Sequence, residues 1–426
     1  MNTDILIVGT GCSGLYCALN LPKDKKITVI TKSTLEKSDS FLAQGGICVL
    51  KDKDDFDSFF EDTVKAGHYE NDRESVGIMI RSSRDVINDL ISLGVDFCRN
   101  DDGSLDYTKE GAHSKKRILY HEDVTGKEIT SCLLEHAKRR ENITLLEHTS
   151  LLDIIMVDNC CRGAVIRKAD GEIVTVSAQY TVLATGGIGG LYRHSTNYRH
   201  LTADAVALAI KHGIELKDVN YIQIHPTTFY SNDTTKRSFL ISESVRGEGA
   251  KLYNKNMERF VEELLPRDLL TAEINKQMEK DGTNFVWEDL RPIGEDVLKK
   301  HFPNIVEFCA ENGYDVTKEC IPVAPAQHYY MGGVKVNKAS KSSADRLYVV
   351  GEAACNGVHG KNRLASNSLL ESLVFAQRAA KDMASNPVEA LSIGDIDLSC
   401  YEDKEKLESE YKALVLDEIK RRTENV

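Results

Sequence analysis

The first thirty residues constrain the fold more than any other part of the chain. An apolar run within Asp4-Ile-Leu-Ile-Val-Gly9 is typical of a buried parallel strand. The glycine loop Gly9-Thr-Gly-Cys-Ser-Gly14 follows, then a helical stretch over residues 15–21 and a second apolar run at 27–30. This order of strand, glycine loop, helix and strand predicts a Rossmann-like α/β fold that binds a dinucleotide.

Each glycine of this loop has a physical task. Gly9 permits the tight turn, Gly11 lets the backbone approach a pyrophosphate, and Gly14 allows the helix to pack closely on the strand. The helix N-terminus then presents free amides to the phosphate charge. The predicted pyrophosphate site comprises Gly9, Thr10, Gly11, Cys12, Ser13 and Gly14.

The second predicted strand argues against a nicotinamide cofactor. It runs into Thr31-Lys32-Ser33, without the acid that holds the ribose in most NAD sites. A second glycine-rich turn, Ala184-Thr-Gly-Gly187, lacks the full fingerprint, and a plain β-turn is the alternative interpretation.

Three later segments favour FAD. The segment Asp39-Ser-Phe-Leu-Ala-Gln-Gly-Gly46 brings backbone amides and Gln44 to the end of the second strand, and Glu352 ends a strand where it could bind ribose or ribityl hydroxyls. Ser366-Asn-Ser-Leu369 opens a helix whose amides could stabilise an anionic reduced flavin. Each segment alone could be a capping turn. The further cofactor residues that we predict are Lys32, Asp39, Ser40, Phe41, Leu42, Ala43, Gln44, Gly45, Gly46, Asp204, Glu352, Ser368 and Leu369.

The 426 residues exceed what one hydrophobic core usually supports, so we expect two domains. Further strands are predicted at 143–146, 152–157, 164–167, 173–176 and 180–184, and helices at 201–213, 267–280 and 369–383. From about residue 221 to residue 330 the sequence changes to charged helical stretches and several prolines. We therefore predict an FAD-binding domain in two segments, 1–220 and 331–385, an inserted α+β capping domain at 221–330, and a short helical tail at 386–426.

Charge and composition limit the kinds of molecule that this chain is expected to bind. With 54 Lys+Arg against 66 Asp+Glu the formal charge is −12, which disfavours nucleic-acid binding. No apolar run approaches the roughly 20 residues that span a bilayer, and the first residues lack a basic leader, so no membrane association is expected. Eleven cysteines without a C-x-x-C pair indicate reduced thiols and a cytoplasmic location, and no metal site is predicted.

Five more motifs carry a resemblance. They are Ala43-Gln-Gly-Gly46, His225-Pro-Thr227, Arg246-Gly-Glu-Gly249, Pro266-Arg-Asp268 and His328-Tyr-Tyr-Met-Gly-Gly333. Together with the glycine loop and the segment 366–369, they make residues 3 to 385 similar to the flavoprotein family of succinate dehydrogenase, fumarate reductase and L-aspartate oxidase. The resemblance implies bound FAD and a capping domain over a dicarboxylate site. Members of this family usually continue into a helical domain of about 100 residues, whereas about 40 residues follow Asn386 here, so a truncated C-terminal bundle is expected.

Two features favour the aspartate-oxidising branch of that family. Residues 37–42 contain no histidine to which FAD could be attached, which implies non-covalent FAD. Glu110-Gly-Ala-His-Ser114, with Arg117-Ile-Leu119 after it, resembles a stretch of the L-aspartate oxidases. The resemblance implies oxidation of L-aspartate to iminosuccinate, the first step of de novo NAD synthesis, with oxygen or fumarate as acceptor and quinolinate synthase as a partner. A soluble fumarate reductase, a succinate dehydrogenase-like subunit and a non-catalytic FAD-binding relative are the alternatives.

The resemblance also implies substrate contacts. Arg363 offers a fork for one carboxylate, and Arg267 lies toward the reacting carbons, where the family places proton delivery to fumarate. The remaining carboxylate donors are His225, His328 and the hydroxyl of Ser242, where many relatives have threonine. Glu110 is expected to pair with the substrate ammonium, which succinate and fumarate lack.

Taken without the family, these residues have ordinary interpretations. His225-Pro226 is typical of a turn at a strand end, His328 of a core histidine, and Glu110 of a solvated loop. The pairs Arg267-Asp268 and Arg246-Glu248 are typical of surface ion pairs.

Overall fold

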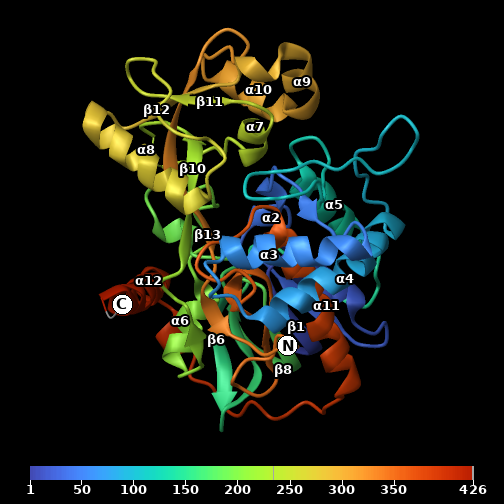
Figure 1. Ribbon diagram of the computed structural model, residues 1–426. Helices are drawn as coiled ribbons and strands as arrows, with labels where there is room; N and C mark the ends of the chain where they lie inside the picture. Colours follow the sequence, from blue (N-terminus) through green and yellow to red (C-terminus); the bar gives the residue numbers. More distant parts are fainter. Residues whose placement is uncertain (234, 425–426) are drawn as a thin grey trace.

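The computed structural model describes residues 1–233 and 235–424, and its chain starts as the glycine loop requires. Strand β1 (Asn2–Val8) leads into helix α1 (Cys12–Asn20), and the chain returns as β2 (Ile27–Ile30). Strand β1 pairs in parallel with β2 on one side and with β8 (Ile173–Leu183) on the other. The predicted Rossmann-like α/β fold is therefore confirmed (Figure 1).

Strand β8 joins a parallel and an antiparallel half of one seven-stranded sheet. The order is β5-β2-β1-β8-β7-β6, and β15 also pairs with β8. The other strands are β5 (Ile143–Leu146), β6 (Ser150–Val157), β7 (Cys160–Arg167) and β15 (Leu347–Val349). The prediction of two strands at 173–176 and 180–184 is wrong, because Ser177, Ala178 and Tyr180 pair with β1 and keep the chain extended.

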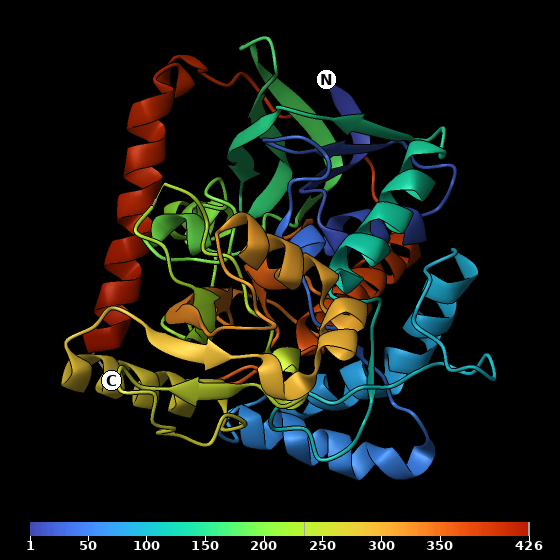
Figure 2. The ribbon, with the colours of Figure 1, turned by 90° about the horizontal axis from the view of Figure 1, so that it is seen from above.

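Helices cover both faces of this sheet, which explains the continuous apolar run of β1. Ile5 and Ile7 face a core shared with α1, α4, α5 and α11, whereas Leu6 and Val8 face a core shared with α6. Figure 2 shows α12 as a long helix at the outer edge, where it contacts α6. These helices are α4 (Arg73–Ser92), α5 (Thr125–Lys138), α6 (Asp204–Lys211), α11 (Asn367–Ser385) and α12 (Lys404–Glu424).

Helix α6 is shorter than the predicted 201–213. It begins at Asp204 because Ala203 adopts a left-handed conformation with φ 64°. It ends at Lys211, and Gly213 follows with φ 68°, as a helix-terminating glycine does.

The inserted α+β domain lies above the Rossmann-like sheet in Figure 1. Its antiparallel sheet has the order β10-β13-β12-β11 and its own hydrophobic core, which includes Val245, Leu270 and Val323. Its strands are β10 (Ile222–Phe229), β11 (Lys251–Tyr253), β12 (Val286–Asp289) and β13 (Ile321–Tyr330). Its helices are α7 (Glu243–Gly247), α8 (Arg267–Asp281), α9 (Glu295–His301) and α10 (Pro303–Glu311).

Short elements complete the chain between these layers. They are α2 (Asp39–Leu42), β3 (Ile47–Cys48), α3 (Phe56–Ala66), β4 (Ile118–Leu119), β9 (Leu216–Lys217), β14 (Gly333–Lys335) and β16 (Ala354–Cys355). Among the described residues, no helix combines the length and the apolar character that crossing a membrane requires.

Candidate functional site

A deep cavity runs from the carboxyl ends of the parallel strands to the inserted domain. It holds about 1490 Å³, counting its open mouth. Loops after β1, β2 and β8 line one end, and side chains of β10, β13 and α8 line the other. Ligands of open α/β sheets bind at this edge, where the strands end.

The loop after β1 leaves polar groups open toward this cavity. Helix α1 begins after Gly11 without a side-chain cap. The buried atoms Thr10 Oγ1, Ser38 Oγ and Gln44 Oε1 have no hydrogen-bond partner within residues 1–233 and 235–424. The Cys12 amide at the start of α1 donates to Ser40 Oγ at 3.0 Å. The helix N-terminus and the two unpaired hydroxyls offer donors to a pyrophosphate, and Gln44 Oε1 offers an acceptor to a neighbouring hydroxyl. The residues present therefore fit a dinucleotide such as FAD.

Two glycines of the loop are required by close packing. Gly9 has φ 120°, and a Cβ on it would lie 2.0 Å from the carbonyl oxygen of Ala184. A Cβ on Gly14 would lie 2.1 Å from the carbonyl oxygen of Gly9. Both positions exclude any larger residue, which is the packing role that the fingerprint predicts.

Most of the predicted cofactor residues line the cavity. Lys32 Nζ donates to Asp204 at 2.8 Å, so these two residues neutralise each other. Burial raises the pKa of Asp39 to about 7 and that of Glu352 to about 8, so these carboxyls are partly protonated near neutrality. The lining residues among those predicted are Gly9, Thr10, Gly11, Cys12, Ser13, Lys32, Asp39, Ser40, Leu42, Ala43, Gln44, Gly45, Gly46, Asp204, Glu352, Ser368 and Leu369.

Two predicted cofactor residues lie outside the lining. Gly14 lies behind the loop in the packing contact with Gly9. Phe41, on the one-turn helix α2, packs against the hydrophobic core instead. We therefore leave Phe41 out of the proposed cofactor site. The turn at Ala184-Thr-Gly, in contrast, lines the cavity.

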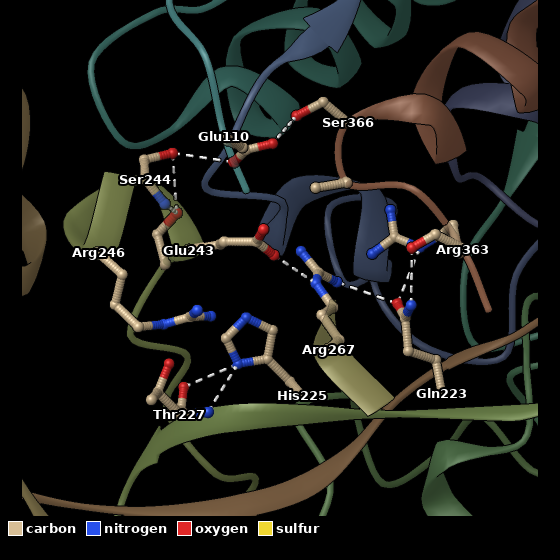
Figure 3. Close-up of polar contacts among 12 residues, drawn as sticks. Glu110, Gln223, His225, Thr227, Glu243, Ser244, Arg246, Arg267, Arg363 and Ser366 are labelled. Carbon is tan, nitrogen blue, oxygen red and sulfur yellow. Dashed lines mark hydrogen bonds and ion pairs between the residues drawn. The ribbon is translucent and has the colours of Figure 1, made fainter. Parts of the chain in front are cut away.

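At the other end of the cavity, Gln223 joins two arginines from different elements (Figure 3). Its Oε1 accepts from Arg267 Nη1 at 3.0 Å and from Arg363 Nε at 3.2 Å. Both arginines are buried and line the cavity, and Arg363 lies over the Tyr329 ring with 4.5 Å between the guanidinium carbon and the ring centroid. One amide oxygen thus holds two cations at fixed separation, which suits a ligand with two carboxylates.

Two buried carboxylates lie beside these cations. Glu243 accepts from Arg267 Nε at 2.6 Å, and Glu110 accepts from Ser244 Oγ at 2.9 Å and from Ser366 Oγ at 2.5 Å. Glu110 is 3% exposed and lines the cavity, so it is not the solvated loop residue that its local sequence suggests.

The two carboxylates differ in their electrostatic surroundings. Burial and the negative charge of Glu243 raise the pKa of Glu110 above its ordinary value. Burial acts on Glu243 as well, but the charges of Arg267 and Arg246 hold the pKa of Glu243 below its ordinary value. Glu243 is therefore the ion-pair partner of Arg267. Glu110 has no ion pair among the described residues, and its raised pKa favours the protonated carboxyl until a cation binds beside it.

The rings of His225 and His328 both line the cavity and contact each other edge to face, with centroids 5.1 Å apart. Burial and the charge of Arg267 hold the pKa values of His225 and His328 well below the ordinary range, so both rings are neutral. His225 Nδ1 contacts Thr227, and His225 Nε2 has no partner among the described residues. Ser242 also lines the cavity, and its Oγ accepts from the amide of Ser244 at the start of α7.

The ordinary interpretations of His225-Pro226, Arg267-Asp268 and Arg246-Glu248 are wrong in the folded chain. His225-Pro226 lies inside β10, at an irregularity of its pairing with β13, and not at a strand end. Neither arginine pairs with its sequence neighbour. Arg246 is buried and donates to the carbonyl of Glu263 at 2.6 Å. Arg267 pairs with Glu243.

Sequence reasoning missed Gln223, Glu243 and Ser244. Gln223 lies two residues before His225 at an alternate buried position of β10, so strand periodicity was a signal that could have found it. Glu243 directly follows Ser242, but nothing in the local sequence indicates that its partner is Arg267.

Comparisons with known proteins show which proteins this chain is similar to. Residues 4–369 match the family model described as FAD binding domain. An L-aspartate oxidase of Clostridium perfringens is 49% identical over 98% of this chain and 94% of its own length. One of Clostridium acetobutylicum is 49% identical over 90% of this chain and 88% of its own length.

Solved structures of two flavoprotein-containing enzymes have folds similar to that of this chain. The E. coli quinol fumarate reductase has a TM-score of 0.86 and 29% identity, with 100% of this chain and 74% of that chain covered. A Mycobacterium smegmatis structure described as Sdh1 has a TM-score of 0.79 and 28% identity, with 96% of this chain and 72% of that chain covered.

Proposed function

The chain belongs to the FAD binding domain family and, within it, to the L-aspartate oxidases, and from this membership we infer that it oxidises L-aspartate to iminosuccinate with FAD. This is the first step of NAD biosynthesis. When bound, FAD would supply the two-electron oxidation that removes a hydride from the substrate α-carbon, so that the amine, after loss of a proton, becomes an imine. The protein supplies binding, alignment and charge.

We propose that the cationic end of the cavity binds the two carboxylates of the substrate. Arg363 and Arg267 provide guanidinium forks, and Gln223 fixes their spacing. His225, His328 and Ser242 add uncharged donors around them. L-Aspartate carries two carboxylates and one ammonium and is a net anion, so a protein with a formal charge of −12 repels it at long range and needs a local cluster of this kind to hold it.

We propose that Glu110 recognises the ammonium group. Its two oxygens accept from serines, and each oxygen has a further lone pair for an N–H donor. Glu243 is already paired with Arg267, so Glu110 is the carboxyl of this end that can pair with the substrate ammonium, whose positive charge favours the ionised form of Glu110. The single observation that carries the amino-acid specificity is this buried, cation-free carboxylate in the lining of a cationic dicarboxylate site.

The experiment is an anaerobic titration of the purified FAD-loaded protein. L-Aspartate is expected to bleach the visible flavin absorbance, with iminosuccinate or its hydrolysis product oxaloacetate appearing in equal amount. Succinate is the matched control, because it has both carboxylates and lacks the amine. Bleaching by succinate with none by aspartate would assign the chain to the succinate-oxidising alternative, and bleaching by neither would remove the proposed function.

We also propose fumarate or oxygen as electron acceptor and quinolinate synthase as a partner. Likeness to fumarate reductases supports fumarate, and the instability of an imine in water favours direct transfer to the next enzyme. A cytoplasmic location stays a prediction, supported by eleven free cysteines with no disulfide among the described residues.

The division into domains is a proposal as well. We propose residues 1–220 and 331–385 as the FAD-binding domain, 221–330 as the capping domain and 386–426 as the tail. Separate sheets and separate hydrophobic cores in the first two units support it.

A further inference from the structure

The loop that carries Glu110 is attached at two points to the segment that follows Arg363. Glu110 accepts from Ser366 Oγ, and three residues later His113 Nε2 lies 3.0 Å from the carbonyl oxygen of Ala365. The amide of His113 also donates to the carbonyl of Glu110 at 3.3 Å, which closes the turn. Residues 110 and 113 of one loop are therefore bonded to the adjacent residues Ser366 and Ala365 of the other.

The protonation of His113 follows from its neighbours. A guanidinium has donors only, so Arg117 Nη1, 3.2 Å away, must donate to His113 Nδ1. A carbonyl oxygen only accepts, so His113 Nε2 must carry the hydrogen that bonds to Ala365. Burial, with the Arg117 charge, lowers the pKa of His113 to about 4, in agreement with a neutral ring.

Arg117 is itself held rigidly by the helical segment 53–66. It is fully buried and donates to both carboxylate oxygens of Asp55 at 3.0 Å. It also donates to Asp62 at 2.6 Å and to Ser58 at 3.0 Å. A guanidinium with this many charged partners cannot reorient, so it fixes the plane of the His113 ring.

Both attached segments adopt backbone conformations that need support. Ala112 has φ 62° and Ser366 has φ 61°, and left-handed conformations are unfavourable for residues with side chains. Ala112 directly precedes His113, and Ser366 is the residue whose hydroxyl bonds to Glu110. Without the bonds of His113, the loop of Glu110 would relax relative to the segment of Arg363, which keeps its bond from the Cys48 amide to the Ser366 carbonyl, and the distance between Glu110 and Arg363 would change.

We propose that His113, held by Arg117, is a positioning residue that sets the distance between the ammonium-binding carboxylate of Glu110 and the carboxylate-binding guanidinium of Arg363, and thereby tunes the site to an amino dicarboxylate. The inference rests on the proposed function. It adds to that function a residue that does not line the cavity, because His113 acts through Glu110 and Arg363, which do.

The test compares two substitutions, each of which can keep one of the two hydrogen bonds that the His113 ring makes. In His113→Gln the side-chain amide can still donate to Ala365, whereas in His113→Asn the side-chain oxygen can accept from Arg117 but the donor to Ala365 is lost. The matched control is His136→Asn, which removes a similar bond from a histidine to the carbonyl of Leu93, 2.8 Å long, on the remote helix α5. All variants are assayed as FAD-loaded protein with L-aspartate, and with fumarate in the reducing direction.

The expected result is selective. His113→Asn raises the KM for L-aspartate about tenfold or more and leaves the KM for fumarate within about threefold, because only aspartate needs the Glu110 contact. His113→Gln and His136→Asn stay within about threefold of the unmodified protein for both substrates. If His113→Asn does not retain FAD, His113→Met, of similar volume and without a donor, replaces it.

Two outcomes would overturn the inference. One is an equal loss for aspartate and fumarate in His113→Asn, which indicates a general structural role. The other is an unchanged KM for aspartate when the donor is absent. Failure of the unmodified protein to oxidise aspartate would instead remove the proposed function, so the two failures are distinguishable.

Discussion

Glu110→Gln tests the assignment of the ammonium contact most directly, because it removes a charge and almost no volume. The glutamine amide can keep both hydroxyl contacts, with its oxygen accepting from one of Ser244 and Ser366 and its nitrogen donating to the other. The substitution also removes the repulsion between Glu110 and Glu243, which helps to raise the pKa of Glu110. We therefore expect a protein that folds at least as stably as the original.

The expected effect on catalysis follows from one lost contact. A hydrogen bond between charged groups contributes about 1.5–3 kcal/mol, and about 1.4 kcal/mol corresponds to a tenfold change in an equilibrium constant. The kcat/KM for L-aspartate should thus fall by about 10- to 150-fold. Fumarate has no ammonium group, so fumarate reduction should change by less than about threefold.

The assay is steady-state kinetics in both directions on the same preparation, with thermal unfolding as the check on stability. Glu110→Asp is the control that keeps the charge and shortens the side chain. A parallel loss of aspartate oxidation and fumarate reduction in Glu110→Gln would refute the ammonium contact, as would unaltered aspartate kinetics.

Three further predictions concern pH and stability. The raised pKa of Glu110 predicts that the KM for L-aspartate increases as pH falls through that pKa, because the protonated carboxyl cannot pair with the ammonium group. The KM for fumarate, measured over the same pH range, should not show this increase. Glu288 is fully buried without a hydrogen-bond partner among the described residues, and burial raises its pKa to about 8 from an ordinary 4.5, so native stability declines as pH rises between these values. Glu288→Gln should therefore unfold at a higher temperature at pH 9, with up to about 5 kcal/mol gained, and at an unchanged temperature at pH 5; equal effects at both pH values would contradict this. Asp153 accepts from Lys211 at 2.6 Å and from Tyr401 at 2.7 Å, so Asp153→Ala should cost about 3 kcal/mol in denaturant unfolding and expose the tail to proteolysis, and an intact tail would contradict the anchoring role.

Features whose residues lie close together in the chain could be predicted from the sequence, and features that depend on distant residues could not. The glycine loop, β1, β2 and α1 lie within thirty residues, and close packing at Gly9 and Gly14 leaves little freedom, so the nucleotide fold was predictable. The single strand β8 was not, because its extension through residues 177–180 depends on pairing with β1, far away in the chain. Likewise, Phe41 occurs within a cofactor-binding motif, but its direction is set by the one-turn helix α2.

The sequence by itself determined a dinucleotide fold, a family and a set of charged residues that could meet a dicarboxylate. Only the tertiary structure decided which charges are neutralised. Gln223 and Arg363 are 140 positions apart, and Glu110 and Ser366 are 256 apart, so no local pattern connects them. Both carboxylates are buried, and their partners separate them, because Glu243 pairs with Arg267 whereas the side-chain partners of Glu110 among the described residues are hydroxyls. That difference depends on distances between segments that fold together from opposite parts of the chain.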